Sequence, residues 1–344
     1  MKKTLYELAA TCQKTPRPPV WMMRQAGRYL PEYRQIREKY SFIEMIKTPK
    51  IAAEITLQPI HRFGMDAAIL FSDILVTAEA LGCHVDIIEK KGPIITPPIR
   101  TRADVDTLNT VNTTKKLTYV LEAIDLLTPQ VTALNIPLIG FAGAPFTVAS
   151  YMIEGQSSPD LKLTKQLMTQ DPSTLHALLE KLTNVTIDYL NAQLKAGVKA
   201  LQIFDTWAGH LSYTDFETYS STYIQKIIQN LNNPNNCPIT VFAKNTTTFA
   251  PLLTTTGANV ISVDWQTNLK TLKNIVPQNM AIQGNLDPYL LFAPDDILTQ
   301  RVDAILNTMQ DRPGYIFNLG HGLMPDINPE KVALVVNRVQ AFHH

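Results

Sequence analysis

The chain has 344 residues, of which 45% are hydrophobic and 18% charged, and its formal net charge at pH 7 is +1. This composition is typical of a globular protein with a large core, and the length fits one α/β barrel with insertions. The near-zero net charge excludes a global basic field for nucleic acid, so a polyanionic ligand would require locally concentrated positive charge. No apolar run is long enough to cross a bilayer or to act as a signal peptide, which predicts a cytoplasmic protein without a membrane partner.

Three cysteines, Cys12, Cys83 and Cys237, lie far apart and form no Cys-x-x-Cys pair. Their spacing matches neither a disulfide framework nor a zinc site, so we expect reduced thiols and no metal. The terminal residues His343 and His344 are either native or the remnant of a tag, and they carry no functional prediction.

Short β-branched or apolar runs recur along the chain, each followed by a polar or glycine cluster and then a helix-like stretch. The runs cover residues 20–22, 67–71, 137–141, 200–204, 239–243, 260–263, 281–283 and 315–318. Each run is continuously apolar rather than alternating, as expected for strands that are buried on both faces of a parallel sheet.

The stretches between the runs have helical signals. Asp171 and Pro172 open one helix that Gly197 ends, and Asn328 with Pro329 opens the last helix of the chain. Eight strands alternating with helices predict a single-domain (β/α)8 TIM barrel over residues 1–344, with insertions between the early units before Leu138. An open doubly wound sheet is the alternative, but its usual Gly-x-Gly-x-x-Gly turn is missing after the first strand.

Polar residues follow every predicted strand, and in a parallel barrel these positions meet at one face, where active sites lie. Asp73 follows the apolar run 67–71, so its carboxylate should be poorly hydrated and needs a donor, either an arginine in a structural ion pair or the substrate itself. Arg24 and Arg28 suit planar carboxylates, although a solvated pair is the alternative. Taken alone, the charge pattern around Arg37 predicts a solvated helix face. His321 lies between two glycines, where it could either contact a ligand or cap a loop.

Five segments at these positions resemble the uroporphyrinogen decarboxylase family. They are PVWMMRQAGRYLP at 19–31, FSDIL at 71–75, GFAGAPFT at 140–147 running into YMIEG at 151–155, QGNLDP at 283–288 and NLGHG at 318–322. The similarity extends from about Leu5 to the last helix, and several long motifs in one order are more specific than any single motif.

The resemblance implies a (β/α)8 barrel that forms a homodimer and uses no cofactor. It implies removal of the four acetate carboxyl groups of uroporphyrinogen III, giving coproporphyrinogen III and four CO2, in haem biosynthesis. Asp73 would contact the pyrrole nitrogens, with Arg37 as proton donor. The residues that would engage substrate besides Asp73 are Arg24, Gln25, Ala26, Gly27, Arg28, Arg37, Phe42, Tyr151, Thr206 and His321, with Thr206 standing where some members have serine.

Two other functions fit parts of the sequence. A corrinoid-to-thiol methyltransferase of the same superfamily would bind zinc through His and Cys, yet no cysteine lies beyond Cys237. A non-catalytic tetrapyrrole-binding protein could keep the same pocket, and only an assay for released CO2 separates it from the enzyme.

Overall fold

The computed structural model describes residues 3–88 and 91–343 of the chain, so His344 lies outside the described residues. Its main sheet is parallel and follows the order β1-β4-β5-β6-β7-β8-β9. The strands are β1 (Ala68–Ile69), β4 (Leu138–Gly143), β5 (Ala200–Asp205), β6 (Ile239–Ala243), β7 (Val260–Ser262), β8 (Ala281–Gln283) and β9 (Tyr315–Ile316). Every strand residue of this sheet is buried, which agrees with the continuous apolar runs.

The segment around Val20 closes the sheet into a ring. Val20 forms a parallel bridge with Phe317, just after β9, and the Phe317 N–H donates to the Pro19 carbonyl at 2.9 Å. On the other side, the Asp66 N–H donates to the Val20 carbonyl at 2.8 Å, just before β1. The eight predicted units therefore form a TIM-like α/β fold, as the sequence indicated.

The predicted first strand, residues 20–22, is wrong in extent because it makes a single bridge rather than a ladder. Side chains accept hydrogen bonds from the backbone there and just after the neighbouring strand β1. The Met22 N–H donates to Gln25 Oε1 at 3.1 Å, and the Phe71 N–H donates to Thr56 Oγ1 at 2.9 Å. Residues 67–71 and 315–318 are likewise shortened, to β1 and β9.

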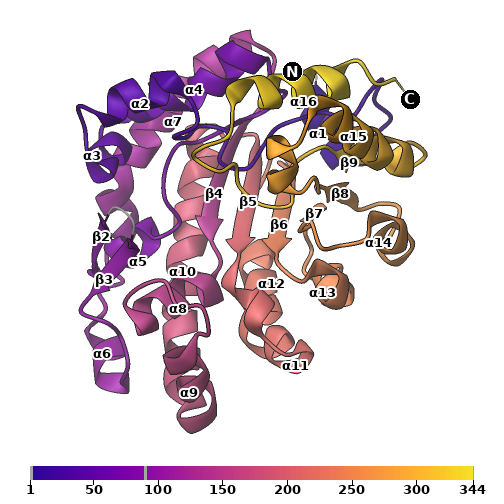
Figure 1. The fold of residues 1–344 in the computed structure, drawn as a ribbon. Coiled ribbons are helices and arrows are strands. Elements are labelled where there is room, and N and C mark those ends of the chain that lie inside the picture. The colour runs from indigo at the N-terminus through magenta and orange to yellow at the C-terminus, as the bar shows by residue number, and fades with distance from the viewer. Residues whose placement is uncertain (1–2, 89–90, 344) are drawn as a thin grey trace.

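Helices surround the sheet, and α6 and α9 extend beyond the carboxyl ends of the strands (Figure 1). The α-helices are α1 (Leu5–Ala10), α2 (Pro31–Arg37), α3 (Phe42–Lys47), α4 (Pro49–Phe63), α5 (Val76–Ala80), α6 (Arg102–Thr107), α7 (Thr118–Ala133), α8 (Pro145–Glu154), α9 (Lys162–Gln170), α10 (Pro172–Ala196), α11 (Tyr213–Phe216), α12 (Thr222–Gln229), α13 (Thr246–Leu253), α14 (Leu269–Ile275), α15 (Asp295–Met309) and α16 (Pro329–Gln340). The 3-10 helices are η1 (Thr113–Leu117), η2 (Trp207–His210) and η4 (Pro288–Phe292), and η3 (Glu217–Ser221) is a π-helix.

The capping signals in the sequence work as predicted. The Asp171 carboxylate accepts the Thr174 N–H at 3.1 Å at the start of α10, and Gly197 ends that helix with φ +116°. Asn328 accepts the Glu330 N–H at 3.0 Å at the start of α16. A side-chain acceptor at this position satisfies a backbone donor that has no partner within the helix.

The extra length before Leu138 forms insertions in the early units, as predicted. Helices α2, α3 and α4 precede β1, and the stretch between β1 and β4 holds α5, α6, α7 and an antiparallel hairpin. The hairpin strands are β2 (His84–Ile88) and β3 (Gly92–Thr96), with His84 opposite Thr96. One continuous cluster of buried apolar residues joins these insertions to the barrel.

Candidate active site

The carboxyl ends of the parallel strands form the mouth of the barrel, and its floor is aromatic. Phe141 and Phe204 keep 6% and 8% of their surface exposed, whereas most neighbouring core residues keep none. Their ring centroids lie 5.7 Å apart, and Phe204 lies 6.2 Å from Phe242. Such a floor suits a flat, largely apolar ligand whose polar groups point elsewhere.

Asp73 lies at this mouth, in the loop between β1 and α5. Its Oδ1 accepts the Leu75 N–H at 2.8 Å, and no other hydrogen bond or ion pair to its carboxylate occurs among residues 3–88 and 91–343. Desolvation by the surrounding protein raises the pKa of Asp73, while the Leu75 N–H and the Arg24 charge oppose the rise and Glu79 adds to it. A carboxylate in this position retains free acceptor capacity for donors that arrive with a ligand.

Arg24 lies next to the loop that carries His321. Its backbone has a left-handed φ of +62°, and its side chain lies directly against the backbone of Gly322. A Cβ at Gly322 would be 2.3 Å from Arg24 Cδ, so only glycine leaves room for this guanidinium arm. The Arg24 side chain is exposed, with no ion pair to any described residue. One of the two glycines beside His321 is therefore explained by the packing of Arg24.

His321 lies among aromatic rings and cations. Its ring centroid is 6.2 Å from Phe242 and 6.0 Å from Trp265, both in edge-on arrangements. Burial, together with the charges of Arg24 and Lys244, lowers the pKa of His321 to about 3. The imidazole is therefore neutral near pH 7, where it can donate one hydrogen bond and accept another. Only their places at the ends of β6 and β7 mark Phe242 and Trp265 in the sequence, which is too weak a signal to single them out.

Tyr151 lies on α8 and reaches the same neighbourhood. Its ring packs edge-on against Trp207 at 5.6 Å. Burial raises the pKa of Tyr151, and the charges of Asp73 and Arg24 act on it in opposite directions. The structure thus brings Tyr151, Asp73, Arg24 and His321 into one electrostatic environment.

Thr206 is held at the mouth by the buried residue that precedes it. The Asp205 carboxylate accepts the Thr147 hydroxyl at 2.6 Å and the Ser220 hydroxyl at 2.5 Å, and its burial raises the pKa of Asp205 to about 6. The Trp207 N–H donates to Thr147 Oγ1 at 3.0 Å. These bonds fix the loop after β5, so the half-buried Thr206 is presented on a rigid backbone.

Phe42 and Arg37 belong to a second group beside β1. Phe71 lies 5.7 Å from Phe42 and 5.8 Å from Tyr33, and both contacts are edge-on. The charges of Arg37 and Arg28 lower the pKa of Tyr33 against the larger effect of its burial. Arg37 Nη1 donates to the Tyr40 carbonyl at 2.9 Å, which leaves most of its guanidinium donors free.

The three residues between Arg24 and Arg28 differ in what they can offer a ligand. The Gln25 side chain is fully buried and donates to the Ala67 carbonyl at 3.0 Å. It therefore links the segment around Val20 to the residue that precedes β1. A ligand contact at this position would have to use the backbone. Ala26 and Gly27 are half-buried.

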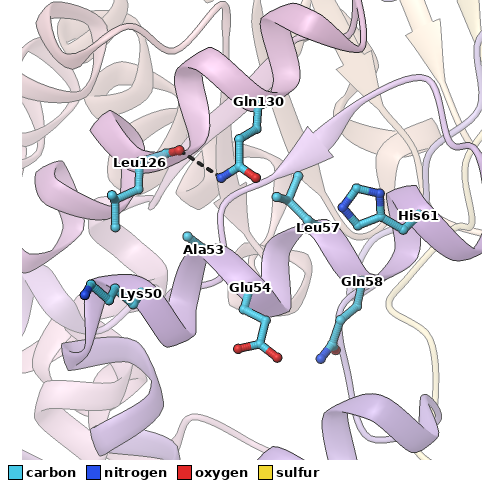
Figure 2. Close-up of a pocket in the computed structure, with 8 residues that line it drawn as sticks. All are labelled: Lys50, Ala53, Glu54, Leu57, Gln58, His61, Leu126 and Gln130. Carbon is cyan, nitrogen blue, oxygen red and sulfur yellow. Dashed lines mark hydrogen bonds between the residues drawn. The ribbon is translucent and has the colours of Figure 1, made fainter.

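A hollow lies on the outer helical layer, between α4 and α7 (Figure 2). It is lined by Lys50, Ala53, Glu54, Leu57, Gln58, His61, Leu126 and Gln130. None of the residues predicted for the site contributes to its lining. In the part of the chain that the structure describes, no helix is long and apolar enough to cross a membrane and no group of three or more His, Cys, Asp or Glu is arranged to hold a metal.

A TIM-like barrel with a desolvated carboxylate and several cations at its mouth defines the chain as an α/β-barrel protein with an enzyme-type site. Comparison with known proteins gives the family. Residues 1–342 match the family model described as Uroporphyrinogen decarboxylase (URO-D). The uroporphyrinogen decarboxylase of Trichlorobacter lovleyi is 46% identical over 323 residues, covering 94% of each chain. That of Geobacter sp. strain M21 is 47% identical over 321 residues, covering 93% of each. The chain belongs to the uroporphyrinogen decarboxylase family.

Among solved structures, a methyltransferase from Methanosarcina mazei matches with a TM-score of 0.84. The match covers 98% of this chain and 99% of that protein, at 20% sequence identity. At this level of identity the likeness concerns the fold alone, and it agrees with the barrel described above.

Proposed function

We propose that this protein decarboxylates uroporphyrinogen III in haem biosynthesis, converting its four acetate side chains to methyl groups and giving coproporphyrinogen III. The observation that carries the proposal is the near-full-length similarity to uroporphyrinogen decarboxylases, at 46–47% identity. The mouth supports it, because it offers an aromatic floor, a carboxylate with free acceptor capacity and several unpaired cations.

The substrate can supply its own electron sink. A proton added to the pyrrole carbon next to an acetate-bearing carbon makes the ring cationic. The bond between the acetate methylene and its carboxylate then breaks, CO2 leaves, and the electron pair neutralises the ring. The exocyclic methylene takes up a proton to become methyl and the ring loses its added proton, so each acetate consumes one proton overall.

Asp73 would bind and stabilise the tetrapyrrole core. Its carboxylate has one protein donor, the Leu75 N–H, so the four pyrrole N–H groups can supply the rest. Those donors would favour the charged carboxylate, opposing the desolvation that raises the pKa of Asp73. A fixed anion interacts more strongly with the cationic ring of the intermediate than with the neutral ring of the substrate, which is the condition for catalysis.

The side-chain carboxylates of the substrate need donors as well. Arg24, Arg28 and neutral His321 are the proposed partners for acetate and propionate groups. Phe42, Tyr151 and Thr206 would line the cleft, together with the backbone of Gln25, Ala26 and Gly27. Guanidinium groups pair with carboxylates in a planar, bidentate geometry, so Arg24 and Arg28 would fix orientation as well as supply charge.

Arg37 is the proposed proton donor. Because the pKa of an arginine exceeds ~12, it would act through a water molecule or a substrate carboxylate rather than directly. Arg37→Lys should lower turnover by at least about tenfold, since a positioned proton donor is worth roughly 10²–10⁴ in rate and lysine keeps part of that function. Single-turnover measurements on the anaerobic enzyme check this, and full turnover by the variant would remove Arg37 from the role.

The test of the proposed function is anaerobic incubation of the purified protein with uroporphyrinogen III, with products oxidised and separated by their number of carboxyl groups. We expect the eight-carboxylate substrate to disappear and the four-carboxylate product to appear, with four CO2 released per substrate. Binding without CO2 release would identify a tetrapyrrole-binding protein instead.

The family resemblance also supports a cytoplasmic homodimer whose two mouths face each other. Sedimentation of the purified protein at micromolar concentration tests the assembly, and a monomer at all concentrations would contradict it.

A further inference from the structure

Lys244 lies at the barrel mouth, directly after β6. The loop after β5 comes close to it: a Cβ at Gly209 would be 2.6 Å from Lys244 Cβ. Glycine at position 209 therefore leaves the space in which the lysine stem packs, and His210 follows next in the chain. This places the half-buried Lys244 against the loop after β5, which also carries Thr206.

The Lys244 ammonium group makes no hydrogen bond or ion pair with any residue that the structure describes. Asp264 is the nearby acid, but both of its oxygens already accept protein donors. Its Oδ2 accepts the Asn245 N–H at 2.5 Å and its Oδ1 accepts the Thr267 hydroxyl at 2.6 Å. A half-buried ammonium without a partner is costly, because desolvation is not offset by a bond.

One acid, Asp264, and one further cation, Arg24, act on the charge of Lys244. Burial lowers the pKa of Lys244, Asp264 opposes this, and Arg24 adds to it. Lys244 in turn helps to lower the pKa of His321 and of His210. Cations that destabilise one another in this way are stabilised together when an anion enters between them.

We propose that Lys244 is a substrate-binding residue that receives one side-chain carboxylate of the porphyrinogen, in a subsite shared with His210. The inference rests on the proposed function and deepens it, since it assigns a cation that the family motifs quoted above do not include. The role is binding and orientation of a carboxylate, without participation in proton transfer.

The experiment compares Lys244→Met, which keeps the length of the stem but removes the charge, with Lys244→Arg, which keeps a charge. Lys270→Met is the matched control, because Lys270 is an exposed lysine on α14, outside the mouth. Steady-state turnover of uroporphyrinogen III is measured anaerobically, and the affinity for uroporphyrin is measured separately by fluorescence. Uroporphyrin is the oxidised macrocycle with the same eight carboxylates, so its binding does not depend on turnover.

We expect Lys244→Met to raise KM and the uroporphyrin Kd about 10- to 100-fold, the usual effect of losing one desolvated charge-assisted bond, with kcat within about threefold. Lys244→Arg should recover most of the affinity, and Lys270→Met should match the wild type. Unchanged KM and Kd in Lys244→Met would overturn the assignment, as would a fall in kcat alone. Failure of the proposed function would be visible separately, as an absence of CO2 release by the wild type.

Discussion

The barrel mouth and the hollow between α4 and α7 both gather polar and apolar side chains, but their polar groups differ. At the mouth, Lys244 and Arg24 have no ionic partner among the described residues, and Asp73 has one backbone donor. In the outer hollow, Gln130 donates to the Leu126 carbonyl of its own helix at 3.0 Å, and Lys50 and Glu54 are exposed to solvent (Figure 2). Of these two regions, as far as residues 3–88 and 91–343 show, the mouth alone holds charged groups that are partly desolvated and make no ion pair.

This difference separates a site from a surface depression. Burial shifts the pKa of Asp73, Lys244 and His321 at the mouth, each in the direction that disfavours its charged form. In the outer hollow, Glu54, Lys50 and His61 are exposed to water, so their charges need no ligand. Charged groups whose desolvation is not offset by a partner are therefore a better guide to function here than the size of a hollow, because a ligand can supply the missing partner.

The largest effect is expected at Asp73. Asp73→Asn should keep the fold and lower turnover by about 10²–10³, because it removes a preorganised charge that the cationic intermediate needs. Anaerobic single-turnover assays measure the rate, and circular dichroism with urea unfolding verifies the fold. Near wild-type turnover by the folded variant would mean that the desolvated charge of Asp73 does not mark the mouth as the active site.

An intermediate effect is expected from His321 as a dependence of stability on pH. The pKa of His321 is about 3 in the folded protein, and about 6.5 is normal for an unfolded chain. Below pH 6.5 the unfolded state binds the proton more readily, so stability should fall as pH falls from 6.5 towards 3. Between pH 7 and pH 5 the loss from this group should be about 1–2 kcal/mol.

Urea unfolding of the wild type and of His321→Asn at pH 7 and pH 5 isolates that contribution, since other titrating groups are common to both proteins. The variant should lose less stability than the wild type over this interval. An equal loss in both proteins would mean that the folded protein does not lower the pKa of His321 through burial and the charges of Arg24 and Lys244.

The smallest effect is expected in the outer hollow. Gln58 is 8% exposed, and its Oε1 has no hydrogen-bond partner among the described residues. Gln58→Met removes this unsatisfied acceptor, so the free energy of unfolding should stay constant or rise by up to about 1 kcal/mol, with turnover unchanged. A tenfold loss of turnover in a stable variant would assign the hollow a role in the reaction and weaken the comparison.

Much of the fold could be predicted from local sequence. The continuous apolar runs located the seven strands of the parallel sheet, because a strand buried on both faces has no polar face. They did not predict the hairpin of β2 and β3, whose residues are mostly only partly buried or exposed. Asp171, Gly197 and Asn328 marked helix ends, because capping depends on a few adjacent residues. The extent of pairing near Val20 was missed, since the side chain of Gln25 and the distant Phe317 decide it.

For the site, the sequence by itself determined which chemical groups follow each strand, and the family motifs singled out Asp73, Arg24 and His321 among them. Only the tertiary structure decided which of these groups lie together, and hence their protonation. Burial lowers the pKa of His321, and the charges of Arg24 and Lys244, which come from two other strand ends, lower it further. The space for Arg24 depends on Gly322. Electrostatic energies and steric limits depend on distances in space, which sequence separation does not specify.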